Sequence, residues 1–479
     1  MGNSNRERQL VKNTIIVAIG KICTQFISFF LLPLYTALLS TEEYGTVDLL
    51  NTCVSLIIPI FFFQMDQAIF RFLIDARKDE EEKDKLISSC LITIFIQVLV
   101  YIVLYMIFGR FINNDYKLFL ATNVIASTIS SLLLQISRGL GDNTTYSIGS
   151  LISGAGTVLF NVLFIAIFRW GAYGMLLATF LANILCAIFV FFRKKIYKYI
   201  RIRNYDKPTI KMLWKYSIPL IPNQLSWWVV NVSDRLVIST FIGVGMNGIY
   251  SAANKFSGIC ITIFNIFNMT WSESASMHIK DDDSSVFFTK IIDSTLKIFI
   301  SLVLLIVAFM PFAFRFLITG SSFADAYYQI PILMASTIVT ITVSLFGSVY
   351  VALKKSNEIA KTSIFAAIIN IIINVIFINK VGLYAASIST FVAYLAMSIY
   401  RYIDVQKYVK IKLNKKLLLS SLVVFLIIII PYYLKNMWLC ILAIILVFIY
   451  SYVSNKDILK NLFSIFLNKI NLLKNQKNK

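Results

Sequence analysis

Long apolar segments separated by short polar loops recur from Thr14 almost to the C-terminus. Most are at least about 20 residues long, which is the length that a helix needs to cross the hydrocarbon core of a bilayer. They are much longer than the ~10-residue alternating segments of a membrane β-barrel. Helices and closed barrels are the only folds that satisfy the backbone in lipid. The pattern therefore predicts an all-α polytopic membrane protein with about fourteen transmembrane helices, near residues 13–39, 44–70, 86–109, 116–137, 146–168, 170–192, 212–242, 246–277, 289–317, 325–353, 359–379, 382–402, 416–434 and 437–454.

Lysine and arginine gather in alternate loops and at both ends of the chain. The richest segments are 71–85, 193–215, 401–416 and 456–479, whereas the opposite loops hold few basic residues. Basic loops of membrane proteins stay in the cytoplasm. The asymmetry therefore predicts that both termini are cytoplasmic and that the number of helices is even. The same rule accounts for the net charge of +21 without nucleic acid as a partner.

The first twelve helices contain a weak internal repeat. The segment YGTVDLLN around Gly45 is similar to NGIYSAAN around Gly248, and one offset relates both the glycines and the final asparagines. Further on, NVLFIAIFRWGAYG from Asn161 is similar to NVIFINKVGLYAA from Asn374. Two matches in the same order predict two parallel six-helix halves, related by an axis along the membrane normal.

This repeat gives a prediction for the domains. We expect an N-lobe at 1–192, a basic cytoplasmic linker at 193–211, and a C-lobe at 212–402. Two additional helices follow at 403–454. The lysine-rich segment 455–479 is predicted to be an amphipathic cytoplasmic tail that lies against anionic lipid.

Polar side chains form a stripe along the first two helices of each half. In the first helix, Lys21 and Gln25 lie four residues apart and therefore share one face. Ionisable residues inside a membrane indicate a functional site, although Lys21 could instead extend its ammonium group to the cytoplasmic surface. Asp66 and Arg71 lie near the cytoplasmic end of the second helix and are candidates for coupling or gating, or else an interfacial ion pair.

The seventh helix is the most polar, and Pro219 and Pro222 are expected to kink it near its start. Its amide and indole groups beside a guanidinium suit a sugar or diphosphate ligand. Asp234 and Arg235 could alternatively pair with each other or lie at the outer interface. The isolated Lys297 of the ninth helix could extend to the membrane surface. The full candidate set comprises Lys21, Gln25, Asn223, Trp227, Trp228, Asn231, Asp234, Arg235 and Lys255 for substrate binding, and Asp66, Arg71, Glu273 and Lys297 for possible coupling or gating.

The sequence gives little support for catalysis or for a bound cofactor. The single histidine, His278, lies in a polar loop beside Asp281–Asp283, and the six cysteines fall in apolar segments without a CxxC pair. No nucleophile-elbow, zinc-protease or P-loop motif is present. The named intramembrane charges of the candidate cavity lean positive, so an anionic substrate is expected. We therefore predict a non-enzymatic protein without a metal or cofactor.

Three segments resemble the Wzx-type polysaccharide flippases of the MOP (MATE-like) superfamily. These are YSIPLIPNQLSWWVVNVSDRLVISTFIGVGMNGIYSAANKF (Tyr216–Phe256), PLYTALLSTEEYGTVDLL (Pro33–Leu50) and the region Phe312–Pro331. The resemblance implies two lobes forming a V that opens alternately to either side. It also implies that undecaprenyl-diphosphate-linked oligosaccharide units cross a bacterial cytoplasmic membrane, for capsule, O-antigen or related envelope polymers. The implied partners are this lipid-linked oligosaccharide, membrane lipids, and the polymerase and chain-length machinery of the same pathway.

Other functions stay open at this point. One is an ion-coupled multidrug exporter of the same superfamily, although an exporter of cations should favour acidic cavity residues. Another is a flippase for teichoic acid or peptidoglycan lipid precursors. An envelope glycosyltransferase or polymerase usually needs an extended outer loop, and the outer loops here are short. Transport could be coupled to the membrane potential, H⁺ or Na⁺.

Overall fold

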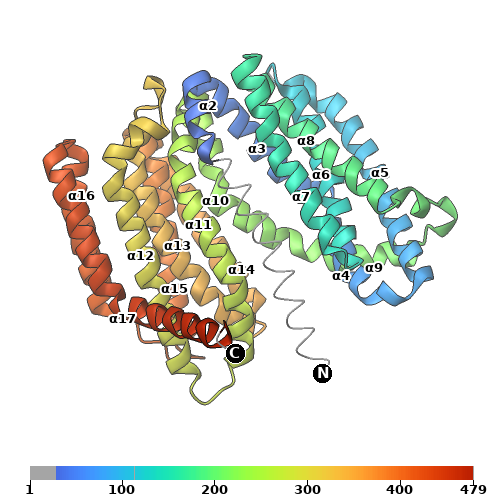
Figure 1. Ribbon diagram of the computed structural model, residues 1–479. Coiled ribbons are helices and arrows are strands. Elements are labelled where there is room, and N and C mark those ends of the chain that lie inside the picture. The colour runs from blue at the N-terminus through green and yellow to red at the C-terminus, as the bar shows by residue number, and fades with distance from the viewer. Residues whose placement is uncertain (1–28, 113, 478–479) are drawn as a thin grey trace. The chain divides into compact units, whose positions relative to one another are not determined.

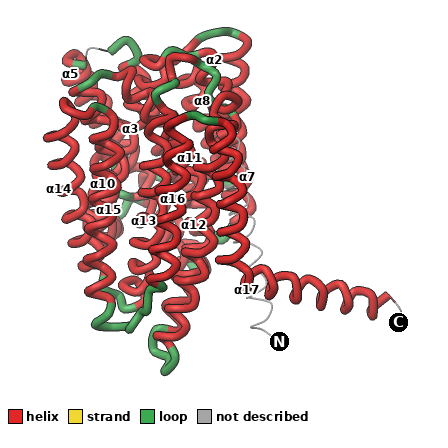
Figure 2. Tube along the Cα trace, turned by 90° about the vertical axis from the view of Figure 1, so that its left-hand side faces the viewer, coloured by secondary structure: helices red, strands yellow, loops and turns green. Residues whose placement is uncertain are grey.

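The computed structural model describes residues 29–477 apart from residue 113, with side chains described up to 460 except at 223 and 356 (Figure 1). The described chain consists of helices and loops, without a strand (Figure 2). This confirms the all-α prediction. Lys21, Gln25 and most of the first predicted helix lie outside the described residues.

Sixteen α-helices follow one another along the described chain. Those up to the start of the second repeat are α2 (Leu32–Leu38), α3 (Thr41–Phe61), α4 (Met65–Asp75), α5 (Glu80–Phe108), α6 (Lys117–Gly139), α7 (Asn143–Asn161), α8 (Gly171–Arg193), α9 (Lys207–Ser217) and α10 (Ile221–Phe241). The remainder are α11 (Val244–His278), α12 (Ser284–Leu317), α13 (Ala326–Ala352), α14 (Ser356–Val381), α15 (Leu383–Val405), α16 (Lys415–Leu434) and α17 (Met437–Lys477).

Eleven helices in the described part of the chain are long and apolar enough to cross a membrane. The chain is thus a multi-pass membrane protein. Helices α10 and α11 are long as well, but they carry the polar residues of the predicted site and are not among the eleven. The total of fourteen spans stays a prediction, because the first predicted helix is largely outside the described residues.

The second predicted helix is broken, so the expectation of one continuous helix over 44–70 was wrong. The hydrogen bonds of α3 end where the Phe62 amide donates to the Ile58 carbonyl at 3.0 Å, and they resume where Met65 donates to Phe62 at 3.1 Å. Between them, Phe63 and Gln64 have φ angles of 52° and 54°. This left-handed region costs a residue other than glycine of the order of 1–3 kcal/mol. Phenylalanine and glutamine are not typical of helix breaks, so the sequence did not predict this break.

The seventh predicted helix is interrupted where its prolines lie, as expected. Helix α9 ends at Ser217, a short 3₁₀ turn over Ile218–Leu220 follows, and α10 begins at Ile221. Pro219 and Pro222 lack the amide hydrogen that a continuous helix would require. The interruption turns one predicted span into a short helix, α9, and a separate polar helix, α10.

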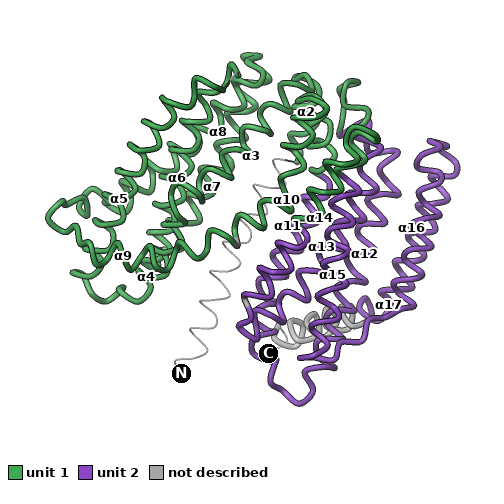
Figure 3. The backbone as a smooth tube through the Cα atoms, turned by 180° about the vertical axis from the view of Figure 1, so that it is seen from behind, with its two compact units in different colours: residues 1–255, 318–325, 367–386 green, residues 256–317, 326–366, 387–479 purple. Residues whose placement is uncertain are grey.

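The chain divides into two compact units (Figure 3). Unit 1 comprises residues 1–255, 318–325 and 367–386, and unit 2 comprises 256–317, 326–366 and 387–479. Each unit therefore combines segments from distant parts of the sequence. The expected lobe boundaries at 192 and 212 stay a prediction.

Within unit 1, the two glycines of the sequence repeat contact each other's helices. A Cβ atom added to Gly45 would lie 2.0 Å from the Val244 carbonyl oxygen, and one added to Gly248 would lie 2.1 Å from that of Thr41. Side-chain movement cannot relieve such overlaps, because the opposing atoms belong to the backbone. Glycine is therefore required at both positions, where α3 and the start of α11 touch.

Within unit 2, Arg401 is a buried part of α15 with only 1% of its surface exposed. Its guanidinium donates to the Val343 carbonyl at 3.0 Å, and to the Thr362 hydroxyl from Nε at 3.0 Å and Nη2 at 2.8 Å. Arg401 thus lies within a helix and not in the basic loop that follows it. The hydrogen bonds of its guanidinium compensate for the loss of water and join α13, α14 and α15.

Candidate functional site

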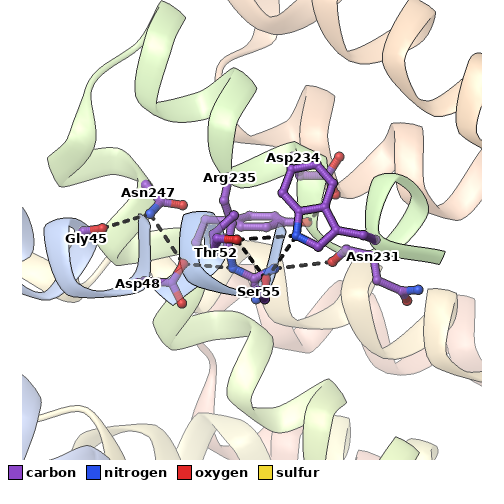
Figure 4. A network of polar contacts seen from close by, with 10 residues as sticks. Gly45, Asp48, Thr52, Ser55, Asn231, Asp234, Arg235 and Asn247 are labelled. Atoms are coloured by element: carbon purple, nitrogen blue, oxygen red, sulfur yellow. Dashed lines mark hydrogen bonds and ion pairs between the residues drawn. The ribbon is translucent and has the colours of Figure 1, made fainter. Parts of the chain in front are cut away.

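The polar stripes of α3, α10 and the start of α11 meet inside unit 1 (Figure 4). On α3, Asp48, Thr52 and Ser55 follow one another at intervals of four and three residues, which places them on one face. On α10, Trp228 and Arg235 lie seven residues apart and also share a face. The two faces are in contact, so the structure brings together polar residues that are more than 170 positions apart in sequence.

The centre of this cluster is an ion pair between α3 and α10. Arg235 Nε lies 2.8 Å from Asp48 Oδ2, with 17% and 20% of the two side chains exposed. Arg235 also donates from Nη1 to the Asn231 carbonyl at 3.2 Å. Asn247 adds a hydrogen bond to the Gly45 carbonyl at 3.0 Å and a longer one of 3.4 Å to Asp48. The close ion-pair partner of Arg235 is therefore Asp48, while Asp234 interacts with Arg235 electrostatically.

The two neighbouring tryptophans of α10 have different environments. Trp228 is buried, and its indole N–H donates to the Ser55 hydroxyl at 3.0 Å and to the Thr52 carbonyl at 3.3 Å. Trp227 is half-buried. Trp228 thus joins α10 to α3 by hydrogen bonds, whereas part of the Trp227 side chain is accessible. Asn231 is exposed and donates to the Trp227 carbonyl at 2.7 Å.

Asp234 occupies a separate buried site in the same unit, with 2% of its surface exposed. Its carboxylate accepts hydrogen bonds of 3.0 Å from the Tyr250 hydroxyl and from the Asn374 amide. One turn away on α14, Asn370 bonds to Ser233 at 3.3 Å. The sequence analysis did not select Asn370 and Asn374. Two amides four residues apart in the otherwise apolar stretch 364–378 were the signal that could have found them.

Lys255 completes the cluster on α11. It is half-buried and interacts electrostatically with Asp48 and Arg235, yet its ammonium forms no hydrogen bond or ion pair in the described part of the chain. The four described charges of the region, two carboxylates and two cations, balance. The expected excess of positive charge therefore depends on Lys21, which lies outside the described residues, as do Gln25 and the side chain of Asn223.

Asp66 and Arg71, both on α4, do not pair with each other, so that alternative was wrong. Arg71 lies 2.8 Å from Asp75, one helical turn further on. Asp66 Oδ2 instead accepts hydrogen bonds of 3.0 Å from Ser131 and from Gln67. The break after α3 starts a new helix at Met65, and this brings Asp66 against α6.

The remaining coupling candidates are in unit 2. Lys297 is not isolated as expected, because its ammonium lies 2.7 Å from the Asp293 carboxylate four residues earlier on α12. Glu273 is exposed on α11. Both residues belong to unit 2, whereas the cluster of Asp48 and Arg235 belongs to unit 1.

A family model described as "Polysaccharide biosynthesis protein" matches residues 10–272. Among curated proteins, the "Uncharacterized membrane protein MJ1375" of Methanocaldococcus jannaschii is 23% identical over 401 residues, which cover 80% of this chain and 94% of that protein. Among solved structures, the lipid II flippase MurJ in an inward closed conformation has a TM-score of 0.69 at 18% identity, over 93% of this chain and 100% of that one. An inward-facing multidrug resistance MATE transporter of the MOP superfamily has a TM-score of 0.65 at 14% identity, over 82% and 98%. At these identities, the structural likeness shows a shared fold.

Proposed function

Because the chain belongs to the polysaccharide biosynthesis protein family, we propose that it flips undecaprenyl-diphosphate-linked oligosaccharide units across a bacterial cytoplasmic membrane. The structural relatives named above are transporters and flippases rather than enzymes. The proposed transport proceeds by alternating access, with both termini in the cytoplasm. Its product would enter the synthesis of capsule, O-antigen or a related envelope polymer.

The observation that carries this proposal is the Lys255 ammonium beside the Arg235–Asp48 ion pair. A diphosphate bears at least two negative charges and cannot cross hydrocarbon without groups that replace its water. Lys255 supplies an ammonium that forms no ion pair or hydrogen bond with another described residue. Arg235 supplies a planar guanidinium that binds phosphate oxygens in pairs.

The proposed binding step is an exchange of partners at Arg235. Without substrate, Asp48 holds the guanidinium at 2.8 Å. The incoming diphosphate competes with Asp48 for Arg235 while Lys255 binds a second phosphate oxygen. After release of the diphosphate, Asp48 restores the ion pair, so the empty carrier does not leave a buried cation without a partner.

A second candidate is an ion-coupled exporter of cationic compounds. The buried Asp234 favours it, because a carboxylate inside a membrane suits a cation or a proton. Asp234 already accepts hydrogen bonds from Tyr250 and Asn374. This arrangement is equally compatible with ion coupling in a flippase, through H⁺ or Na⁺.

Proteoliposomes that contain a fluorescently labelled undecaprenyl-diphosphate oligosaccharide can test both candidates. A membrane-impermeant reductant would measure how fast labelled lipid reaches the outer leaflet. We expect Arg235→Ala and Lys255→Ala to abolish flipping, and Arg235→Lys to recover only part of it because the bidentate fork is lost. Lys361→Ala is a matched control, since Lys361 is an exposed lysine that pairs with Glu358.

Two results would contradict the proposal. Full flipping by both alanine variants, at normal protein levels, would exclude the cationic site. Export of a cationic dye by wild-type protein that does not flip the labelled lipid would favour the exporter instead.

A further inference from the structure

A cavity of about 480 Å³ lies beside the break between α3 and α4. Its walls come from α3, the break itself, α4, α5, α6 and the beginning of α10, all within unit 1. A volume of this size is typical of sites for small molecules. The cavity adjoins the cluster at Ser55, but neither Asp48 nor Arg235 lines it.

Several polar groups of the cavity wall have unused hydrogen-bonding capacity. Asp66 Oδ2 accepts from Ser131 and Gln67, whereas its Oδ1 accepts from no described residue. The carboxamides of Gln64 and Gln224 also line the cavity, and neither forms a side-chain hydrogen bond in the described part of the chain. One carboxylate oxygen and two amides are therefore available to a ligand.

The break places Gln64 and Asp66 at this position. Gln64 adopts the left-handed conformation, and Asp66 follows in the first turn of α4. Irregular backbone at membrane depth is found where it lines a cavity, and interrupted helices are common at the binding sites of transporters. A continuous helix would carry both side chains in other directions. The break thus has a role in forming the cavity.

The composition of the wall selects a neutral hydroxylated ligand. Among the described residues of the wall, Asp66 is the one charged side chain, and its negative charge repels a phosphate. A carboxylate accepts hydrogen bonds from hydroxyl groups, and an amide both donates to them and accepts from them. Apolar residues, including Phe62 and Leu132, also line the wall and suit the C–H faces of a sugar ring. A dehydrated ion would instead need a close cage of oxygen atoms.

We propose that this cavity is a subsite for one uncharged sugar residue of the transported oligosaccharide. Asp66 and Gln224 bind its hydroxyl groups, and Gln64 adds a further amide from the break. This inference rests on the proposed function for the identity of the larger substrate. It assigns sugar recognition to Asp66 in place of the coupling or gating role that the sequence suggested.

Saturation-transfer NMR on the purified full-length protein in detergent would test the subsite, with N-acetylglucosamine and glucose as probes. We expect at least one of the two sugars to bind, and Asp66→Asn and Gln224→Ala each to weaken its binding about ten-fold, as loss of a hydrogen bond to a charged or amide group predicts. Asp75→Asn is the matched control, because Asp75 is on the same helix and pairs with Arg71. The exposed Gln224 keeps the test valid if Asp66→Asn does not fold.

Binding of undecaprenyl diphosphate, which lacks the sugar, separates this inference from the proposed function. Lys255→Ala should weaken diphosphate binding and leave sugar binding intact, whereas Asp66→Asn should do the reverse. Absence of sugar binding to wild-type protein, or sugar binding that is unchanged in both cavity variants, would overturn the subsite alone. Wild-type protein that binds the sugar but not the diphosphate would overturn the proposed function.

Discussion

Helix α3 around Gly45 and helix α11 around Gly248 make the same backbone contact but carry different charges beside it. Three residues after the glycine, α3 has Asp48 where α11 has Ser251. Seven residues after it, α3 has Thr52 where α11 has Lys255. The contact requires glycine on both helices, so both repeats have the same residue at this position. The side chains beside it are not so constrained, and their charges have diverged.

A second pair of related positions shows the same contrast. Asn161 and Asn374 begin the other repeated segment, and both are buried. Asn161 donates to the neutral Tyr35 hydroxyl at 2.8 Å, whereas Asn374 donates to the Asp234 carboxylate at 3.0 Å. The repeat thus preserves a buried amide that bonds to another helix, while the acceptor has changed from neutral to charged.

The largest expected effect tests the backbone contact at the two glycines, which α3 and α11 share. Gly45→Ala and Gly248→Ala each place a Cβ about 2 Å from a carbonyl oxygen, so we expect a loss of about 3 kcal/mol or more in stability. The measurement is the yield and the thermal midpoint of the purified protein in detergent. Gly258→Ala on α11 is the control, since an added Cβ there would meet no atom within 4 Å. Normal stability of either variant would refute the contact.

The second-largest expected effect tests Asp48 of α3, which has the uncharged Ser251 as its equivalent on α11. Asp48→Asn leaves Arg235 without its ionic partner, and because the pair is partly exposed we expect a loss of about 2 kcal/mol rather than the full cost of a buried pair. The double variant Asp48→Asn/Arg235→Gln should regain stability yet fail to flip lipid. Thermal unfolding and the flipping assay measure the two properties separately. Wild-type flipping by the double variant would mean that the pair is structural only.

The two buried asparagines give a matched comparison of smaller size. Asn374→Ala removes a hydrogen bond to a carboxylate and should cost about 1.5–3 kcal/mol, whereas Asn161→Ala removes one to a neutral hydroxyl and should cost about 1 kcal/mol. Thermal midpoints of the two variants under one condition would measure the difference. Equal shifts would show that the charged acceptor adds nothing.

The smallest effect concerns the turns that precede the fifth helix of each half. In the first half, hydrogen bonds from Thr145 and from Lys194 outweigh the effect of burial and hold the pKa of Asp142 below its ordinary value. In the corresponding turn of the second half, Lys355 donates a hydrogen bond to the neutral hydroxyl of Tyr408 at 3.0 Å.

A carboxyl group with a lowered pKa stabilises the fold above its unfolded pKa and loses this contribution as pH falls through the folded value. Acidification below about pH 4, the ordinary pKa of an aspartate, should therefore remove about 0.5 kcal/mol from the wild type, since the group is partly exposed to solvent. Asp142→Asn should lack this part of the acid dependence. Unfolding curves of both proteins between pH 3 and 6 would measure it, and identical curves would contradict the assignment.

The apolar pattern was sufficient to predict the class of fold and most of the helices, because lipid forces the length and composition of each span. The prolines at 219 and 222 revealed one interruption. The break at Phe63 and Gln64 escaped notice, since neither residue type favours the left-handed conformation. Its stability depends on packing that a local pattern does not contain.

Part of the candidate site could be predicted from local sequence patterns, and the part that depends on packing between distant segments could not. The polar stripe of α10 identified Arg235, and that of α11 identified Lys255. The partner of Arg235 could not be read from the sequence, because Asp48 lies far away along the chain and only the packing of α3 on α10 joins them. The Lys297–Asp293 pair, in contrast, has a spacing of four residues within one helix and was accessible to prediction.

The buried Arg401 of unit 2 has a consequence for how relatives of this chain vary. A Cβ added to Gly347 would lie 2.8 Å from Arg401 Nη1, so the absence of a side chain at one position makes room for the longest basic side chain at the other. Neither residue can change freely by itself. A smaller residue at 401 would release 347 to accept alanine or serine, and a larger residue at 347 would expel the guanidinium from its carbonyl and hydroxyl partners. The two positions should therefore covary among homologues, as a pair defined by shared volume and not by opposite charge.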